Sequence, residues 1–144
     1  MPAKPNPTDT AYSATPLPKK LGLVLTKARP LNAAIVGAPE GFLTLLGDLP
    51  EYVTIQPRIT PETQLALCFV RTLRDVDAVM DMLAAKLPLG ASAWIIRPKT
   101  HHKPGFNEND VREAGLAIGL VDYKICSVDA DWSGIKFAWR KTAK

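Results

Sequence analysis

The residues with the most evident capacity for chemistry lie in one basic stretch of the chain. This basic stretch, residues 97–103, contains Arg97, Lys99, His101, His102 and Lys103. Cationic side chains bind phosphate and carboxylate groups, so the stretch is a candidate for binding a small anion or a nucleic acid. The alternative is a solvated loop without a ligand. Adjacent side chains on an extended loop point apart, and no Cys, Asp or Glu lies close in sequence, so no metal site is predicted.

A second candidate is the glycine-containing segment GAPEGF at residues 37–42, between an expected strand and an expected helix. Such a turn can bring a nucleotide or adenosyl group close to the backbone. However, it matches neither GxGxxG nor GxxxxGK[ST]. Pro39 has no amide hydrogen, and Glu40 places a carboxylate at the expected helix start, where it would cap the helix dipole and repel an anion. Capping is therefore favoured over ligand contact, with Gly37, Glu40 and Gly41 as the candidate cofactor-binding residues.

A third segment, residues 129–134, combines two carboxylates with a serine and a tryptophan. The spacing identifies neither a base nor an orienting acid for Ser133, so no catalytic residue is assigned. Turn chemistry explains the Asp, Ser and Gly residues. Trp132 is expected to pack over the edge of the sheet and is kept as a ligand-binding candidate.

Length and composition favour one soluble domain. The chain has 144 residues, of which 47% are hydrophobic and 22% are charged, and its formal net charge is +4. We expect a flexible proline-rich arm over residues 1–14 and a single domain over residues 15–144. No apolar run has the length of a membrane span or the character of a signal peptide, and Cys68 and Cys126 each stand alone in apolar runs, as buried free thiols do. These features predict a cytoplasmic protein without a membrane partner.

The elements that must position these candidates alternate between short apolar runs and stretches with helical spacing. The pattern predicts helices at 16–21, 40–46, 73–87 and 108–120, and strands at 33–38, 52–59, 65–70, 91–96, 121–128 and 135–140. Pro57 places the second strand at an edge or ends it early. The last two strands are close enough for an antiparallel hairpin. The predicted class is α/β, a three-layer Rossmann-like fold with a mostly parallel six-stranded sheet and a C-terminal antiparallel hairpin.

Four segments carry a resemblance: YSATPLPKKLG at 12–22, GAPEGF at 37–42, LPLGASAWIIRPK at 87–99, and NDVREAGLAIGLVDYKICSVDADWSGIKF at 109–137. Together they are similar to a bacterial family of small proteins classed as a domain of unknown function, over most of residues 12–140. The order of elements also resembles a trimmed form of the Rossmann-like fold of S-adenosylmethionine-dependent methyltransferases. The resemblance implies a fold and supplies no catalytic residue. The two histidines of the loop at residues 100–106 are not part of the family pattern.

The favoured hypothesis is a degenerate methyltransferase-like domain that binds a protein partner or small ligand without catalysis. It follows from the missing nucleotide-binding features, because the second strand ends in Gln56, Pro57 and Arg58 and offers no acidic side chain for ribose hydroxyls. Two alternatives stay open. One is anion or nucleic-acid binding through the basic stretch, with nucleic acid less favoured, and the other is S-adenosylmethionine-dependent methyl transfer. No cofactor is predicted.

Overall fold

The computed structural model describes residues 17–23 and 30–141. The elements occur in the order α2 (Leu17–Leu21), β1 (Leu31–Val36), α3 (Phe42–Leu46), β2 (Val53–Gln56), β3 (Leu65–Phe69), α4 (Leu73–Lys86), β4 (Ser92–Pro98), the 3₁₀ helix η1 (Thr100–His102), α5 (Glu108–Ala117), β5 (Leu120–Ser127) and β6 (Trp132–Trp139). Within this described part, no helix is both long and apolar enough to cross a membrane.

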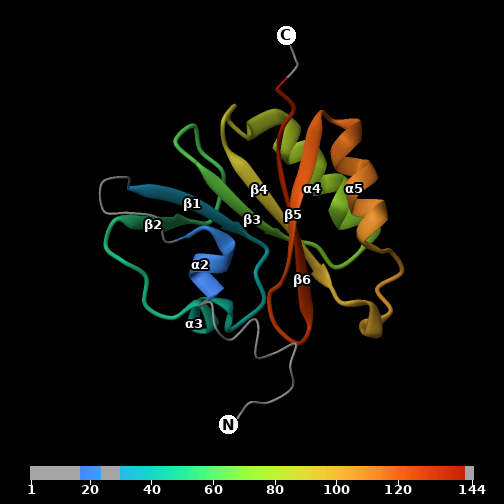
Figure 1. Ribbon diagram of the computed structural model, residues 1–144, viewed down its shortest axis with the longest axis horizontal. Coiled ribbons are helices and arrows are strands. Elements are labelled where there is room, and N and C mark those ends of the chain that lie inside the picture. The colour runs from blue at the N-terminus through green and yellow to red at the C-terminus, as the bar shows by residue number, and fades with distance from the viewer. Residues whose placement is uncertain (1–16, 24–29, 142–144) are drawn as a thin grey trace.

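One six-stranded sheet runs through the molecule in the order β2-β1-β3-β4-β6-β5 (Figure 1). Strands β2, β1, β3 and β4 are parallel to one another, whereas β6 runs antiparallel to both β4 and β5. This topology confirms the predicted mostly parallel sheet with its antiparallel C-terminal hairpin. It also confirms that β2, which ends just before Pro57, lies at an edge.

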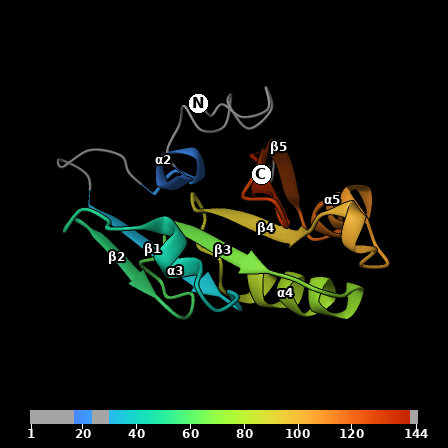
Figure 2. The ribbon, with the colours of Figure 1, turned by 90° about the horizontal axis from the view of Figure 1, so that it is seen from below.

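Helices cover both faces of the sheet, so the fold has three layers. Helices α4 and α5 pack on one face, through a core that includes Val76, Leu83 and Val111. Helices α2 and α3 pack on the other face, through Leu21, Phe42 and Leu46. Figure 2 shows α2 and α4 on opposite sides of the sheet. Strand β3 is buried along its whole length, as expected of a parallel strand covered on both faces.

The two long helices begin with capping boxes. The Thr72 hydroxyl accepts a hydrogen bond from the Asp75 amide, and the Asp75 carboxylate accepts one from the Thr72 amide. Asn107 and Asp110 form the same arrangement at α5. Such reciprocal bonds satisfy amide groups that have no partner within the helix, which explains why both helices start where the sequence predicts.

Helix α5 lies unusually close to the sheet at Gly115. A Cβ atom at this position would lie 2.4 Å from Cε2 of Phe137 on β6. Phe137 is fully buried, so its ring has little room to move away. The glycine is therefore required for the close approach of α5 to the sheet rather than for backbone flexibility.

Two predicted boundaries are wrong for identifiable reasons. Helix α3 begins at Phe42 rather than at residue 40, because Gly41 adopts a left-handed conformation with φ 89° and separates Glu40 from the helix. Strand β6 begins at Trp132 rather than at residue 135. One oxygen of the Asp129 carboxylate accepts hydrogen bonds from the amides of Asp131 and Trp132, which tightens the hairpin turn and lengthens the strand.

The N-terminal part of the described chain is tied to the sheet by Trp94. The indole Nε1 of this fully buried residue donates a hydrogen bond of 2.8 Å to the Leu21 carbonyl of α2. Leu17 packs against the same core. The predicted arm over residues 1–14 lies outside the described residues. Tyr12, which is expected from the sequence to pack on the domain, lies outside them as well.

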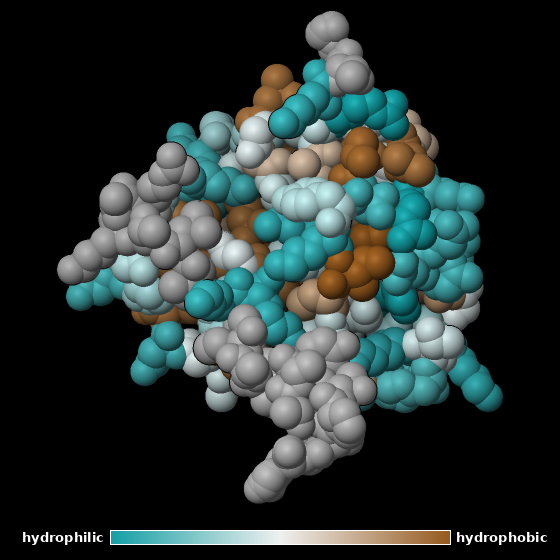
Figure 3. Space-filling model, in the orientation of Figure 1, coloured by the Kyte–Doolittle hydropathy of each residue, from teal (hydrophilic) through white to brown (hydrophobic). Residues whose placement is uncertain are grey.

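Strand β5 forms the other edge of the sheet and carries exposed apolar side chains. Val121, Tyr123 and Ile125 are 37%, 56% and 49% exposed. Figure 3 shows that the face over β5 and β6 is mixed, with brown areas interrupted by teal side chains. On this face Lys136 Nζ lies 5.6 Å from the centre of the Tyr123 ring.

Candidate functional site

The carboxyl ends of the four parallel strands meet at one edge of the sheet. From β1 the chain passes to β2 on one side, and then to β3 on the other side of β1. This change of direction makes the gap between β1 and β3 the topological switch point, where open α/β sheets bind their ligands. The loops that follow β1, β2, β3 and β4 are therefore the place to look for a site.

A pocket of 280 Å³ lies at the carboxyl ends of β1 and β2, on the α3 face of the sheet. It is lined by Ile35, Ala38, Leu43, Ile55, Gln56 and Pro57. The walls are apolar except for the amide of Gln56, and Leu43 is 59% exposed although it belongs to a helix that packs on the core. A pocket of about 300 Å³ is at the lower limit for small-molecule sites, so it suits a group the size of a nucleoside.

The turn after β1 borders this pocket. Gly37 has φ 72°, and a Cβ atom there would lie 3.3 Å from the Phe69 carbonyl oxygen, so the turn passes close to the end of β3. Glu40 is exposed and makes no capping contact with α3, whose N-cap is Gly41. The predicted capping role of Glu40 is therefore wrong, because the left-handed Gly41 separates its carboxylate from the helix.

Arg71 lies across the switch point. Its Nη1 donates a hydrogen bond of 3.0 Å to the Gly37 carbonyl, and its guanidinium carbon lies 5.4 Å from the centre of the Trp132 ring. Among the described residues no carboxylate forms an ion pair with Arg71, and the side chain is exposed. Arg71 therefore presents an unneutralised positive charge beside the turn. Arg71 was not among the site residues predicted from the sequence, although its position shortly after the buried strand β3 was a usable signal.

An aromatic row extends along the same edge. The rings of Phe42 and Phe69 meet edge to face with centres 4.8 Å apart, and Phe69 meets Trp132 in the same manner at 5.2 Å. Trp132 pairs with Pro98 at the start of β6 and packs, partly buried, against the core on the α2 and α3 face. The row connects the turn after β1 to the loop after β4 by an apolar path.

Two residues of the basic stretch are held by structural contacts. Arg97 is buried, and its guanidinium donates to the Pro98 carbonyl and lies 3.8 Å from the Glu108 carboxylate. Glu108 also pairs with Arg112, which pairs in turn with Asp122 and so ties α5 to β5. The hydrogen bond to Asp122, followed by the one to Glu108, raises the pKa of Arg112. The network leaves Arg97 little freedom to meet a ligand.

Lys99 is occupied in a similar way. Its Nζ donates a hydrogen bond of 2.7 Å to the Ser127 hydroxyl at the end of β5, and its amide donates to the Asp131 carbonyl. These contacts join the loop after β4 to the β5–β6 turn. Of the basic stretch, His101, His102 and Lys103 remain exposed.

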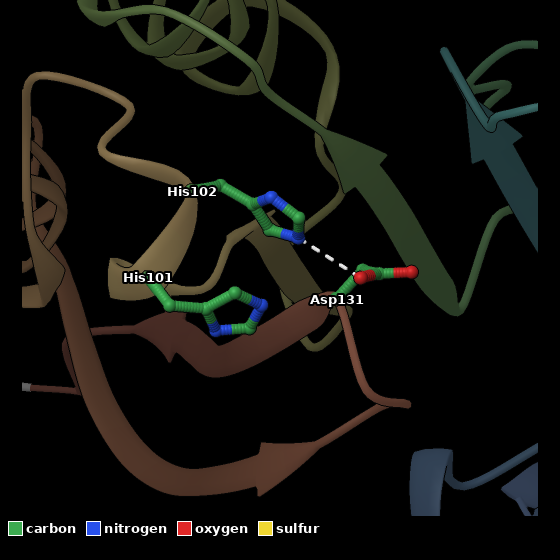
Figure 4. A group of neighbouring side chains, drawn as sticks. All are labelled: His101, His102 and Asp131. Carbon is green, nitrogen blue, oxygen red and sulfur yellow. Dashed lines mark hydrogen bonds and ion pairs between the residues drawn. The ribbon is translucent and has the colours of Figure 1, made fainter.

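His101, His102 and Asp131 form a group that we call the histidine cluster (Figure 4). The two imidazole rings have centres 4.2 Å apart, and His102 Nε2 lies 2.9 Å from Asp131 Oδ1. The expectation that the two side chains point apart on an extended loop is wrong, because they belong to the 3₁₀ helix η1. The carboxylate that the local sequence lacks comes from the β5–β6 turn, 29 residues away.

Both cysteines are free and buried, as predicted. Burial raises the pKa of Cys68 from 9.0 to about 12, and burial also raises the pKa of Cys126. Thiols held in the neutral form are poor nucleophiles. Neither cysteine is therefore a candidate for covalent chemistry.

The raised pKa of Cys68 makes stability sensitive to alkaline pH. Between pH 9 and about pH 12 the thiol ionises in the unfolded chain but stays protonated in the folded one, so the free energy of unfolding should fall as pH rises through this window. Below pH 9 the thiol should not make the free energy of unfolding depend on pH. Urea unfolding at a series of pH values should therefore show a smaller alkaline loss for Cys68→Ala than for the unaltered chain. If the free energy of unfolding fell equally with pH in both chains, ionisation of Cys68 would not be the cause of the alkaline loss.

Known proteins resemble this chain in fold but not in sequence. No protein-family model and no curated protein sequence matches the chain. The predicted membership of a bacterial family of unknown function therefore stays a prediction.

Solved structures that are similar to this fold include several methyltransferases, two of them described as SAM-dependent. The N-methyltransferase NodS from Bradyrhizobium japonicum is 13% identical, with a TM-score of 0.56 over 92% of this chain and 99% of that one. A SAM-dependent methyltransferase from Aquifex aeolicus is 12% identical, with a TM-score of 0.54 over 93% and 98%. A TehB-like SAM-dependent methyltransferase from Corynebacterium glutamicum is 10% identical, with a TM-score of 0.55 over 94% and 100%. At these identities the likeness establishes a methyltransferase-like fold.

Proposed function

We propose that this chain binds S-adenosylmethionine at the carboxyl ends of β1, β2 and β3 and transfers its methyl group to a second substrate. The observation that carries the proposal is the apolar pocket at the ends of β1 and β2, in a fold whose solved neighbours include SAM-dependent methyltransferases. Fold alone does not imply function, so the proposal depends on whether this pocket suits the adenosyl group.

The pocket walls suit a nucleoside. Ala38, Leu43, Ile55 and Pro57 offer an apolar surface for the adenine ring. Gln56 takes the place of the acidic side chain that the sequence lacks at the end of the second strand. Its amide can both accept and donate a hydrogen bond, so it can pair with the vicinal ribose hydroxyls without a negative charge.

Arg71 suits the amino-acid end of the same compound. Its guanidinium bonds to the carbonyl of Gly37, next to the pocket residue Ala38, and has no carboxylate partner among the described residues. The N–H groups of Arg71 that do not bond to Gly37 can hold a carboxylate by two hydrogen bonds. When bound, S-adenosylmethionine supplies a methyl group on a sulfonium, which a substrate nucleophile can take. The chain's contribution would be to orient this group and to exclude water with the aromatic row of Phe42, Phe69 and Trp132.

The structure weakens one argument for the degenerate hypothesis. That hypothesis needed the Glu40 carboxylate to occupy the start of the helix, where a nucleotide would approach. Glu40 is exposed and separated from α3, so it is free to turn toward solvent. The turn remains unsuited to a phosphate, because Pro39 offers no amide hydrogen and the helix is only five residues long. An adenosyl group without phosphates therefore suits the apolar pocket and its adjoining turn better than a nucleotide does.

Calorimetric titration of the full chain with S-adenosylmethionine and S-adenosylhomocysteine tests the proposal. The expected result is saturable binding of one molecule of either compound per chain. ATP, which carries the same adenosine on a triphosphate, should bind more weakly because the turn lacks a phosphate loop. Absence of heat with both adenosyl compounds would contradict the proposal and return the degenerate hypothesis to first place.

A further inference from the structure

The histidine cluster brings three metal-binding side chains together from two separate loops. His101 and His102 come from η1, after β4, and Asp131 comes from the turn between β5 and β6. Each residue offers a ligand atom, and these atoms all lie within 4.8 Å of one another. Figure 4 shows the His102 ring directed toward the Asp131 carboxylate, with the His101 ring beside it. The chain has only two histidines, and both belong to this group.

The separations are close to those of ligands on one metal ion. Two ligand atoms that each lie about 2.0–2.1 Å from a tetrahedral zinc ion are about 3.4 Å apart. His102 Nε2 and Asp131 Oδ1 are 2.9 Å apart, so these two atoms would have to move slightly apart to bind one ion between them. The remaining separations, at most 4.8 Å, would need to close by a rotation of exposed side chains rather than by a backbone shift.

Both loops are held by hydrogen bonds that their backbone amides donate, which limits the entropy cost of assembling the ligands. The Lys99 amide donates to the Asp131 carbonyl at 2.7 Å, and the Asp131 amide donates to the Asp129 carboxylate at 2.8 Å. Within η1, the His102 amide donates to the Lys99 carbonyl at 2.9 Å. The backbone that carries the three ligands is therefore a connected unit even though its parts are distant in sequence.

The local charges favour a cation over an anion at this point. An anion approaching His102 would meet the Asp131 carboxylate at the same position. Of the lysine and arginine residues of the basic stretch, Arg97 pairs with Glu108 and Lys99 bonds to Ser127. Lys103, which directly follows His102, stays exposed. Two imidazoles and one carboxylate are a ligand set that suits zinc and related divalent transition metals, whereas magnesium and calcium prefer oxygen ligands alone.

From this geometry we propose that the histidine cluster binds a divalent transition metal ion, with zinc as the representative ion. His101, His102 and Asp131 supply three ligands, and water completes the coordination at this exposed position. The proposal does not depend on methyl transfer, because the cluster lies at the end of β4 and the pocket lies at the ends of β1 and β2.

The test is a titration of the untagged full chain with zinc chloride, followed by calorimetry and by ¹⁵N NMR of the imidazole rings. The expected result is one zinc ion per chain, shifts of the nitrogen signals of both histidines, and reversal by a chelator. Magnesium at the same concentrations should produce neither effect. Zinc affinity should fall at acidic pH, because protonated imidazoles do not bind metal.

Variants separate a three-ligand site from an incidental contact. His101→Ala, His102→Ala and Asp131→Ala should each lower zinc affinity by at least about tenfold, or about 1.4 kcal/mol. Asp48→Ala removes an exposed carboxylate elsewhere and should leave zinc affinity unchanged. All four positions are exposed, so the variants should fold, which circular dichroism can check. Absence of zinc binding, or a loss confined to His102→Ala, would overturn the proposal.

Discussion

Replacing Ala38 with phenylalanine should lower the affinity for S-adenosylmethionine by at least about tenfold, or about 1.4 kcal/mol. Ala38 lines the 280 Å³ pocket, and an aromatic ring at this position would occupy much of the space proposed for adenine. Because Ala38 is only half-buried, the ring should be accommodated without loss of the fold. Calorimetric titration with S-adenosylmethionine and with S-adenosylhomocysteine measures the change.

Ala78→Phe is the matched control for this experiment. Ala78 lies on the exposed side of α4, which covers the opposite face of the sheet, so the same change in volume there should leave the affinity unaltered. Unaltered binding by the folded Ala38→Phe variant would mean that the adenosyl group does not occupy the pocket between β1 and β2.

Replacing Trp94 with alanine should lower the free energy of unfolding by about 3–5 kcal/mol. Trp94 is fully buried at the centre of the α2 and α3 face, and its ring fills the space above Gly134, where a Cβ atom would lie 3.0 Å from the indole. Removal of the ring leaves a cavity and also leaves the Leu21 carbonyl without its 2.8 Å hydrogen bond. Urea unfolding followed by circular dichroism measures the loss.

Trp94→Phe divides this effect into its two causes. It keeps most of the buried ring but removes the donor to Leu21, so its cost should be smaller than that of Trp94→Ala and should include about 1–3 kcal/mol for the unpaired carbonyl. Leu89→Ala is the control, because Leu89 is 87% exposed and should change stability by no more than about 0.5 kcal/mol. Equal stability of Trp94→Ala and the unaltered chain would show that α2 and the Trp94 ring contribute nothing to the fold.

Elements with a strong local signal could be predicted from the sequence. The short apolar run at residues 65–70 predicted the strand β3, and the helical spacing from residue 73 predicted α4. Pro57 indicated an edge strand because it cannot donate to a neighbouring strand, and β2 does lie at the edge. In each case the physical cause lies within a few residues of the pattern that reveals it.

The features that could not be predicted depend on contacts between distant residues or on a single backbone angle. Asp131 reaches His102 from 29 positions away through the pairing of β4 with β6, which no local pattern reports. The left-handed angle of Gly41 separates Glu40 from α3 and reverses the expected role of that carboxylate. The contact of Arg71 with Gly37 could not be predicted, because it depends on the order of β1 and β3 in the sheet.

Contacts between distant residues also explain why the favoured function changes from a domain without catalysis to a methyltransferase. The sequence offered no glycine motif and no acidic residue after the second strand, and both absences favoured a domain without catalysis. The pocket is built instead from residues of β1, α3 and β2 that are separated in the chain and carry no recognisable motif. Only the assembled edge of the sheet brings Gln56 and the apolar walls into one cavity and places Arg71 at the adjoining turn.

Mapping of backbone amide shifts during titration with S-adenosylhomocysteine tests where the adenosyl group binds. The proposal predicts that the largest changes fall at residues 35–43, at residues 55–57 and at Arg71, with smaller changes in the histidine cluster and on the α4 face. Saturable shifts centred on the histidine cluster, or the absence of any shift at millimolar concentration, would contradict binding of S-adenosylmethionine at the carboxyl ends of β1 and β2.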